Sequence, residues 1–195
     1  MKHFFMAYFI VVFLITFNVW AQHTYIFTPQ SHIWVAGTSS LHEWNCNVGT
    51  FQGSVIVIPP DSLLQLQQVY VEIPVEEMDC KNNIMNKKMK KALKAKENPK
   101  IIFKMTRQLQ SRALGDSALK VTLEGELQIA GVKRNVSIEA IGKTIQDGFR
   151  FEGKKVLRMT EFGIHPPTAL FGMLKTGDVI TVFFDVQIQS KRGSQ

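Results

Sequence analysis

The sequence contains few of the patterns that mark an enzyme, a metal protein or a nucleotide-binding protein. Across its 195 residues there is no nucleophile motif, no glycine-rich phosphate loop and no recurrent metal-ligand spacing. His32, His42 and His165 are scattered along the chain, whereas zinc sites bring their ligands in short, repeated spacings. We therefore expect no catalytic residues, no bound metal and no cofactor.

Long apolar runs are also rare, and the one at the start of the chain indicates export. Lys2 precedes an unbroken apolar run, Phe4–Ile15, and Ala21 follows shortly after it. This order is typical of a signal peptide, which we place at residues 1–21. An uncleaved anchor is the alternative, but the run is shorter than the ~20 apolar residues that span a bilayer, and Asn18 interrupts its end. We expect a soluble periplasmic or secreted protein after cleavage.

Cysteine is scarce, since only Cys46 and Cys80 occur in the whole chain. Disulfides form and persist in the oxidising compartments that exported proteins reach. One Cys46–Cys80 disulfide is the simplest arrangement of two cysteines there. Two separate buried thiols are the alternative.

Acidic residues are outnumbered, with 16 Asp and Glu against 23 Lys and Arg, which gives a net charge of +7. A basic chain favours anionic partners, among them phosphate head groups and membrane surfaces. The sequence has neither zinc-finger spacing nor the aromatic-basic motif of an RNA-binding domain, so we expect no nucleic-acid partner. The length of residues 22–195 suits one domain with a single core.

Helical periodicity is nearly absent, and an alternation with a period of two dominates from residue 24 onward. Such alternation is typical of strands with one buried and one exposed face. Ala130-Gly131 can supply a hairpin turn. Near the C-terminus one alternating row is entirely apolar, and it comprises Ile180, Val182, Phe184, Val186 and Ile188. The sequence predicts about eight strands, at 32–38, 43–58, 67–75, 100–107, 119–129, 135–140, 149–159 and 179–188.

So many long antiparallel strands favour a closed barrel, because closure leaves no exposed sheet edge. A barrel of eight strands has an interior just wide enough for one small ligand. A two-sheet sandwich would bury the same apolar residues, and the sequence does not separate the two architectures.

One helix is predicted, over residues 83–96, and its two faces differ. Apolar residues recur at helical spacing on one face, and they are Ile84, Met85, Met89, Ala92 and Leu93. The lysines lie largely on the other side, and they are Lys87, Lys88, Lys90, Lys91 and Lys94. The helix should end before Asn98-Pro99, because proline disfavours helix at the residue before it. The basic face is either simply solvated or a contact for an anion or a membrane surface.

Large apolar side chains, most of them aromatic, are numerous for a domain of this size. Pockets for apolar ligands are lined by such residues, but a well-filled core explains them equally well. They include Trp34, Phe51, Phe103, Phe151, Phe162, Phe171, Phe183 and Phe184.

Several segments resemble the YceI-like family, and their order along the chain is the family's order. The segments are Trp34–Trp44, Met85–Ala95, Asn98–Phe103, Gly125–Val136, Met159–Ala169, Leu174–Asp178 and Val182-Phe183. The first is similar to the early strands of the branch found in Bacteroidetes-type bacteria. Gly125–Val136 is similar to the family's hairpin, Gly-x-Leu-Thr-Ile-x-Gly-Val-Thr-Arg-Pro-Val, although Gln128, Lys133 and Asn135 replace the usual Thr, Thr and Pro.

The resemblance implies an all-β fold, an extended antiparallel eight-stranded lipocalin-like barrel with one short amphipathic helix. It also implies periplasmic binding or carriage of a polyisoprenoid or other lipid-like amphiphile rather than an enzyme. Two alternatives stay open, a ligandless envelope stress or interaction module and an enzyme acting on a bound lipid. The expected partners are a lipid or polyprenyl-type ligand and, transiently, a membrane surface. The candidate ligand-binding residues are Trp34, Phe51, Phe103, Phe151, Phe162, Phe171, Phe183, Lys87 and Lys91.

Overall fold

The computed structural model describes residues 23–58, 64–115, 117–169 and 173–191. The predicted signal peptide, residues 1–21, and the candidate ligand residue Phe171 lie outside the described residues. In chain order the elements are β1 (His23–Phe27), β2 (His32–Ser39), β3 (Glu43–Val48), β4 (Gln52–Ile58), β5 (Gln65–Pro74), the 3-10 turn η1 (Val75–Glu77), β6 (Met78–Asp79), α1 (Asn83–Ala92), β7 (Lys100–Ala113), β8 (Ala118–Ile129), β9 (Val132–Ile145), β10 (Gly148–Arg158), the 3-10 turn η2 (Met159–Phe162), β11 (Thr168–Ala169) and β12 (Leu174–Ser190).

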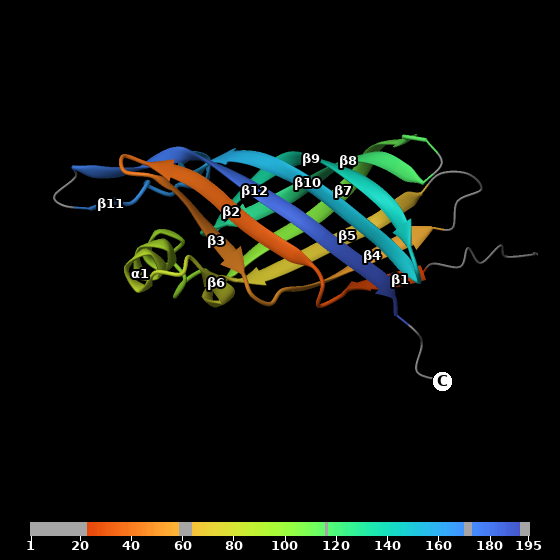
Figure 1. The fold of residues 1–195 in the computed structure, drawn as a ribbon, viewed down its shortest axis with the longest axis horizontal. Coiled ribbons are helices and arrows are strands. Elements are labelled where there is room, and N and C mark those ends of the chain that lie inside the picture. The colour runs from red at the N-terminus through yellow and green to blue at the C-terminus, as the bar shows by residue number, and fades with distance from the viewer. Residues whose placement is uncertain (1–22, 59–63, 116, 170–172, 192–195) are drawn as a thin grey trace, which may run out of the picture.

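Eight of the strands close into an antiparallel barrel (Figure 1). Hydrogen-bonded neighbours follow the order β1-β4-β5-β7-β8-β9-β10-β12, and β12 pairs back with β1, where Phe27 lies opposite Ile188. Closure of the ring removes the exposed edges that a sheet of this size would otherwise present. In the part of the chain that the structure describes, the predicted eight-stranded barrel with one short α-helix is therefore confirmed, and the two-sheet sandwich is excluded.

The strands nearest the N-terminus are interrupted midway. β12 pairs with β10 along one edge. Along its other edge it pairs first with β2 and then with β1, so β1 and β2 lie end to end beside β12. β3 and β4 continue alongside them, paired with β2 and β1 respectively. The single strand predicted at 43–58 is thus two strands, because at Gly49 the backbone N–H donates to the carbonyl oxygen of Glu77 (2.7 Å). Beyond this break, β2, β3 and β6 extend the sheet toward the helix.

The helix begins at Asn83, as predicted, but ends at Ala92 rather than near residue 96. Lys94 adopts a left-handed backbone conformation with φ of 52°, and the Ala95 N–H donates to the carbonyl oxygen of Lys90 (3.0 Å). A left-handed residue followed by this hydrogen bond is a common way for a helix to end. The chain therefore leaves the helix before Asn98-Pro99 can end it.

The predicted hairpin turn at Ala130-Gly131 is confirmed. Ile129 of β8 pairs with Val132 of β9, so the turn has two central residues. Their φ values are 49° for Ala130 and 83° for Gly131, the positive pair that a two-residue hairpin of type I′ requires. The long β8–β9 pair that follows brings two inward-facing apolar rows side by side.

Charged residues form cross-strand pairs on the outer face of the barrel, where alternation places every second side chain. The pairs include Arg107–Glu124, Lys120–Glu139, Lys133–Glu126, Lys143–Glu152 and Arg150–Asp185. A polar outside and an apolar inside are thus separated by the sheet itself. In the described ranges, no helix has the length and apolar character needed to span a bilayer.

Candidate functional site: an apolar cavity in the barrel

A cavity of about 440 Å³ lies inside the barrel, and alternate residues of its strands line it. The clearest row is on β12, where the lining residues are Ile180, Val182, Phe184, Val186 and Ile188. These are the residues of the apolar row that the sequence showed. β8 adds Val121, Leu123, Leu127 and Ile129 to the lining. The volume is in the range of sites that hold small organic ligands, and the lining is mostly hydrocarbon.

The two ends of the cavity differ in chemistry. At the end away from the helix, Val55, Val121 and Ile188 face the space, and all three are buried. At the other end the lining passes to the β2–β3 hairpin, α1 and β11, where Leu41 is 67% exposed. The cavity therefore reaches the surface at the helix end, which we call the mouth.

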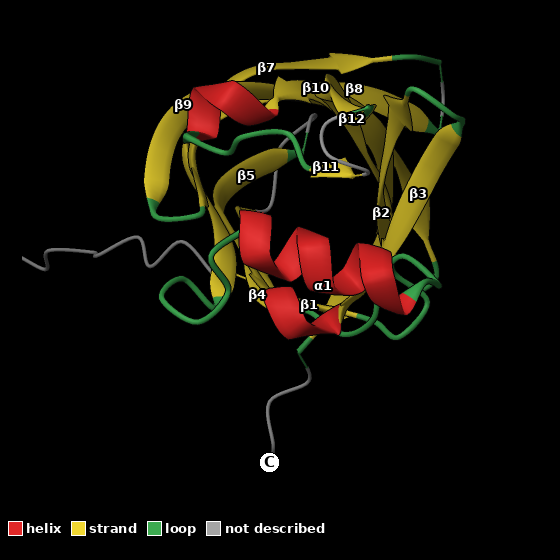
Figure 2. Cartoon of the chain, turned by 90° about the vertical axis from the view of Figure 1, so that its left-hand side faces the viewer, coloured by secondary structure: helices red, strands yellow, loops and turns green. Residues whose placement is uncertain are grey.

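The helix lies across part of the mouth (Figure 2). Its lining residues are Met85, Lys88, Met89, Ala92 and Leu93, a helical stripe that faces the barrel. Ile84, which the sequence assigned to the same apolar face, is instead 68% exposed. One face of α1 thus forms part of the wall, and the rest remains accessible to solvent or to a partner surface.

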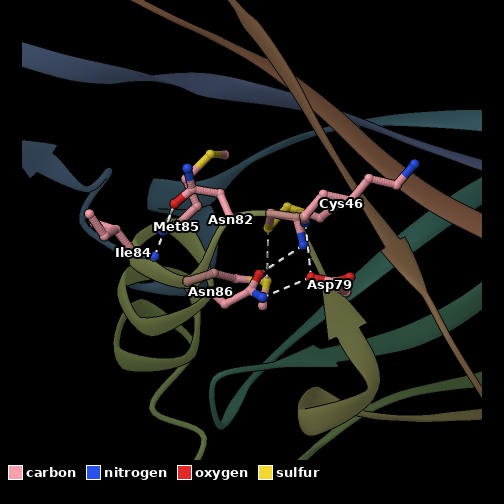
Figure 3. The surroundings of a disulfide bond; sticks show 9 residues. Cys46, Asp79, Asn82, Ile84, Met85 and Asn86 are labelled. Carbon is pink, nitrogen blue, oxygen red and sulfur yellow. Dashed lines mark hydrogen bonds between the residues drawn. A yellow bond between two sulfur atoms is a disulfide. The ribbon is translucent and has the colours of Figure 1, made fainter.

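The start of the helix is held by side-chain hydrogen bonds (Figure 3). Asn82 Oδ1 accepts hydrogen bonds from the N–H groups of Ile84 (2.9 Å) and Met85 (3.1 Å), which caps the first turn. Asn86 Oδ1 accepts from the Cys80 N–H (2.8 Å), and Asn86 Nδ2 donates to Asp79 Oδ1 (2.8 Å). These bonds join the helix to the segment that leads into it.

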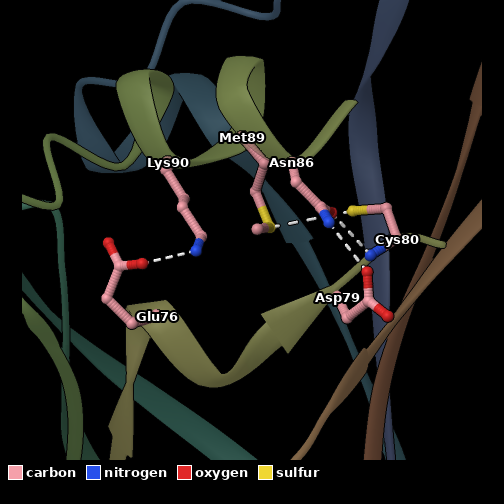
Figure 4. Close-up of polar contacts among 6 residues, drawn as sticks. All are labelled: Glu76, Asp79, Cys80, Asn86, Met89 and Lys90. Carbon is pink, nitrogen blue, oxygen red and sulfur yellow. Dashed lines mark hydrogen bonds and ion pairs between the residues drawn. The ribbon is translucent and has the colours of Figure 1, made fainter. Parts of the chain in front are cut away.

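A disulfide and an ion pair tie the same segment to the barrel. The Cys46–Cys80 disulfide is confirmed, and it links β3 to the connection between β6 and α1. Cys80 Sγ lies 3.8 Å from Met89 Sδ, so the helix packs on the disulfide (Figure 4). Lys90 forms an ion pair with Glu76 on the other side of the helix. The helix is therefore a fixed part of the mouth.

The structure separates the candidate ligand residues into two groups. Phe103, Phe151 and Phe162 line the cavity. Trp34 and Phe183 are not part of the lining, because Ile33, Val35 and Phe184, their neighbours in sequence, face inward instead. Phe51 packs against Phe27 at a ring distance of 5.3 Å, at the break between β3 and β4, and is also absent from the lining.

The candidate lysines divide in a similar way. Lys87 and Lys91 are exposed and do not line the cavity. The sequence assigned Lys88 to the same basic face, but this assignment is wrong: Lys88 lines the cavity, and its Nζ donates to the carbonyl oxygen of Thr168 in β11 (3.0 Å). Lys155, which the sequence did not single out, also lines the cavity from β10.

The charged residues of the described lining all carry positive charge, and they are Lys88, Lys155, Arg158 and Lys175. No Asp or Glu belongs to the described lining. Within the same part of the chain, no three His, Cys, Asp or Glu side chains gather closely enough to hold a metal ion.

Glu72, whose pKa is strongly lowered, lies outside the cavity. Glu72 of β5 alternates with the lining residues Val71 and Ile73, so its side chain is on the outer face. A hydrogen bond from Lys100 Nζ (2.8 Å), with others from Tyr70 and Gln52, lowers the pKa of Glu72 to about 2. These partners lie on β4, β5 and β7, so the cluster joins three strands and does not serve the cavity.

Comparison with known proteins decides the family. The YceI-like domain matches residues 17–188. The chain belongs to the YceI-like family. A comparison with curated proteins found no match.

Solved structures share the YceI-like fold at low sequence identity. BcnA of Burkholderia cenocepacia is 15% identical with a TM-score of 0.64, covering 80% of this chain and 95% of its own. A polyisoprenoid binding domain from Saccharophagus degradans, described as implicated in plant cell wall breakdown, is 10% identical with a TM-score of 0.66, covering 85% and 98%. A YceI protein of Campylobacter jejuni is 16% identical with a TM-score of 0.57, covering 75% and 84%. The fold of this chain therefore matches nearly the whole length of BcnA and of the Saccharophagus degradans domain.

Proposed function

We propose that this YceI-like protein binds a lipid-like amphiphile, of which a polyisoprenoid is one example, with its apolar chain inside the barrel. The observation that carries the proposal is the cavity of about 440 Å³, whose walls are apolar from Ile188 to Leu127 and which opens at the helix end. Each methylene transferred from water to such walls contributes about 0.8 kcal/mol, so an alkyl or prenyl chain supplies ample binding free energy. The polyisoprenoid binding domain of similar fold supports the same reading.

The role we propose is carriage or sequestration in the periplasm, without catalysis. The apolar run at Phe4–Ile15 supports export, and a disulfide suits an oxidising compartment. An open cavity favours binding over a ligandless module, for which a filled interior would be the simpler design. The polar lining residues lie at the mouth, and they are Ser39, His42, Thr168 and Thr176. An enzyme would instead need at least two polar side chains that converge on a reacting bond inside the cavity.

The mouth also supports a transient contact with a membrane surface, from which the ligand would be taken. Leu41, Ile84 and Met173 are large apolar residues with 67%, 68% and 74% of their surface exposed. They belong to the β2–β3 hairpin, the helix and the segment just before β12, which are the elements around the mouth. Exposed apolar side chains among lysines are typical of surfaces that rest in a bilayer interface.

Two experiments test the proposal: one identifies the bound ligand, and the other blocks the cavity so that the ligand no longer binds. Mass spectrometry of organic extracts from the protein purified from its native envelope should show a stoichiometric amphiphile. In parallel, Ala140→Phe adds a ring inside the cavity, since Ala140 is a buried lining residue. This variant should lose both the extracted ligand and binding of the neutral dye N-phenyl-1-naphthylamine.

A matched control places the same ring outside the cavity. Ile141→Phe changes the next residue of β9, which is not part of the lining, and should keep dye binding. Absence of any amphiphile in the extracts, together with equal dye binding by the two variants, would contradict lipid carriage and favour the interaction module.

A further inference from the structure

Lys155 is a cation on the inner face of an apolar stretch of β10. It lies in the inward row between Phe151 and Leu157, whose exposed fractions are 7% and 4%. Val156, the next residue, is 55% exposed and faces outward. Lys155 is opposite Val182 of β12, another lining residue, so its stem leaves the wall inside the barrel.

Among the described residues, Lys155 differs from the outer lysines because its ammonium group has no partner. Lys120, Lys133 and Lys143 each form an ion pair with a glutamate on a neighbouring strand. Within the described part of the chain, the Lys155 ammonium group forms neither an ion pair nor a hydrogen bond. Lys155 is half-buried, and its ammonium is free to form a charge-assisted hydrogen bond with a ligand anion.

The other charged residues of the lining reinforce the preference for an anion. Lys88 donates to the carbonyl oxygen of Thr168, and Thr168 pairs with Lys175 across the β11–β12 ladder, so these two lysines lie close together at the mouth. Arg158 remains 3.7 Å from Asp178, a carboxylate that is not part of the lining. With no carboxylate in the described lining, the site attracts anions and disfavours cations.

We propose that the cavity selects amphiphiles with an anionic head group, a carboxylate or a phosphate, and that Lys155 binds this head. The inference rests on the proposed function, because the apolar rows must hold the chain of the same molecule. The head lies toward the mouth, near Lys155, Lys88 and Lys175. The chain runs from there toward Phe151 and Ile188, where the described lining is apolar.

The experiment uses three competitors of equal chain length against the neutral dye. Dodecanoate, dodecyl phosphate and dodecan-1-ol displace N-phenyl-1-naphthylamine from the purified mature protein. Wild type should bind both anions more tightly than the alcohol. Lys155→Met keeps the length of the stem but removes the charge, and should weaken both anions by roughly 10- to 100-fold while leaving the alcohol nearly unchanged. Lys155→Arg should restore the preference for anions.

Lys154→Met is the matched control, because Lys154 is the exposed neighbour on β10 and is not part of the lining. It should leave all three affinities unchanged, and unaltered dye binding confirms that each variant is folded. Equal affinity of wild type for all three competitors, or equal losses in Lys155→Met, overturns the head-group site and leaves chain binding intact. Failure of wild type to bind any of the three refutes chain binding as well. Competition by inorganic phosphate against dodecyl phosphate would assign the site to a free anion and overturn the head-group role.

Discussion

Trp34 and Phe183 stack face to face across the β2–β12 pair, with ring centroids 5.1 Å apart and planes inclined by 6°. Both rings lie outside the cavity, whereas Phe184, one residue further along β12, lines it. Phe183 and Phe184, which are consecutive on β12, therefore have different structural roles. The outer ring covers the sheet and the inner ring forms the wall of the ligand site.

This division predicts opposite effects for neighbouring substitutions. Trp34→Leu and Phe183→Leu should lower the free energy of unfolding without changing dye binding, and a double-mutant cycle should give a coupling of about 0.5–1.5 kcal/mol for the stacked pair. Phe184→Ala should weaken dye binding because it removes part of the wall. Denaturant unfolding and dye titration measure the two effects. Loss of dye binding in Phe183→Leu, with Phe184→Ala unaffected, would reverse the assignment of faces.

The disulfide should stabilise the barrel and hold the mouth together. Cys46 and Cys80 are 34 positions apart in sequence, and the chain-entropy treatment gives roughly 4 kcal/mol for closing a loop of that length. Reduction, or the double change Cys46→Ala and Cys80→Ala, should lower the melting temperature clearly. Hydrogen exchange should rise most in α1, because the helix packs on the disulfide through Met89. A uniform rise across all strands, with α1 no more affected than β8, would show that the disulfide does not fix the helix.

Glu72 should make the stability of the fold depend on pH in the acid range. The pKa of Glu72 is lowered from 4.5 to about 2, chiefly by its hydrogen bond with Lys100. Because the folded-state pKa is the lower one, the stabilisation is fully present above about pH 4.5 and is lost as the pH falls toward 2. We expect Glu72 to account for roughly 1–3 kcal/mol of the free energy of unfolding lost over that window.

Two variants test this assignment by urea unfolding at a series of pH values. Glu72→Gln should be less stable than wild type at pH 7, and the difference should shrink as the pH approaches 2. Lys100→Met removes the main cause of the low pKa, so this variant should be less stable than wild type at pH 7 and should lose less of its free energy of unfolding between pH 4.5 and pH 2. Parallel pH profiles for Glu72→Gln and wild type would refute the role of this carboxylate.

Strand positions and the closing hairpin were predictable because alternation and a two-residue turn are local signals. The all-apolar row on β12 even marked the inner face correctly, and Phe184 could have been chosen over Phe183 on that basis. Lys155 could also have been found, because alternation puts it in the same row as Phe151 and Leu157, whereas Lys154 falls in the row of Arg150 and Glu152. It was missed because a lysine is not among the residue types that mark an apolar lining. The early end of α1 could not be predicted for a different reason. It depends on the left-handed backbone conformation of Lys94, which lysine seldom adopts.

The rim of the mouth leads to the last prediction, which concerns ligand uptake from membranes. If Leu41, Ile84 and Met173 enter the bilayer interface, changing them to Asp should weaken binding to vesicles of anionic phospholipid and slow transfer of a lipid from the vesicle to the protein. Leu109→Asp is the matched control, because Leu109 is 46% exposed but lies on β7, away from the elements that form the mouth. Dye binding should stay unchanged in Ile84→Asp, Met173→Asp and Leu109→Asp, because none of these residues belongs to the described lining and the dye reaches the cavity from solution. Vesicle co-sedimentation at low and high salt then separates the apolar contribution from that of the exposed lysines Lys87 and Lys91, because added salt screens the lysines alone. Equal weakening by Leu109→Asp and Leu41→Asp would mean that vesicles do not meet the protein at its mouth.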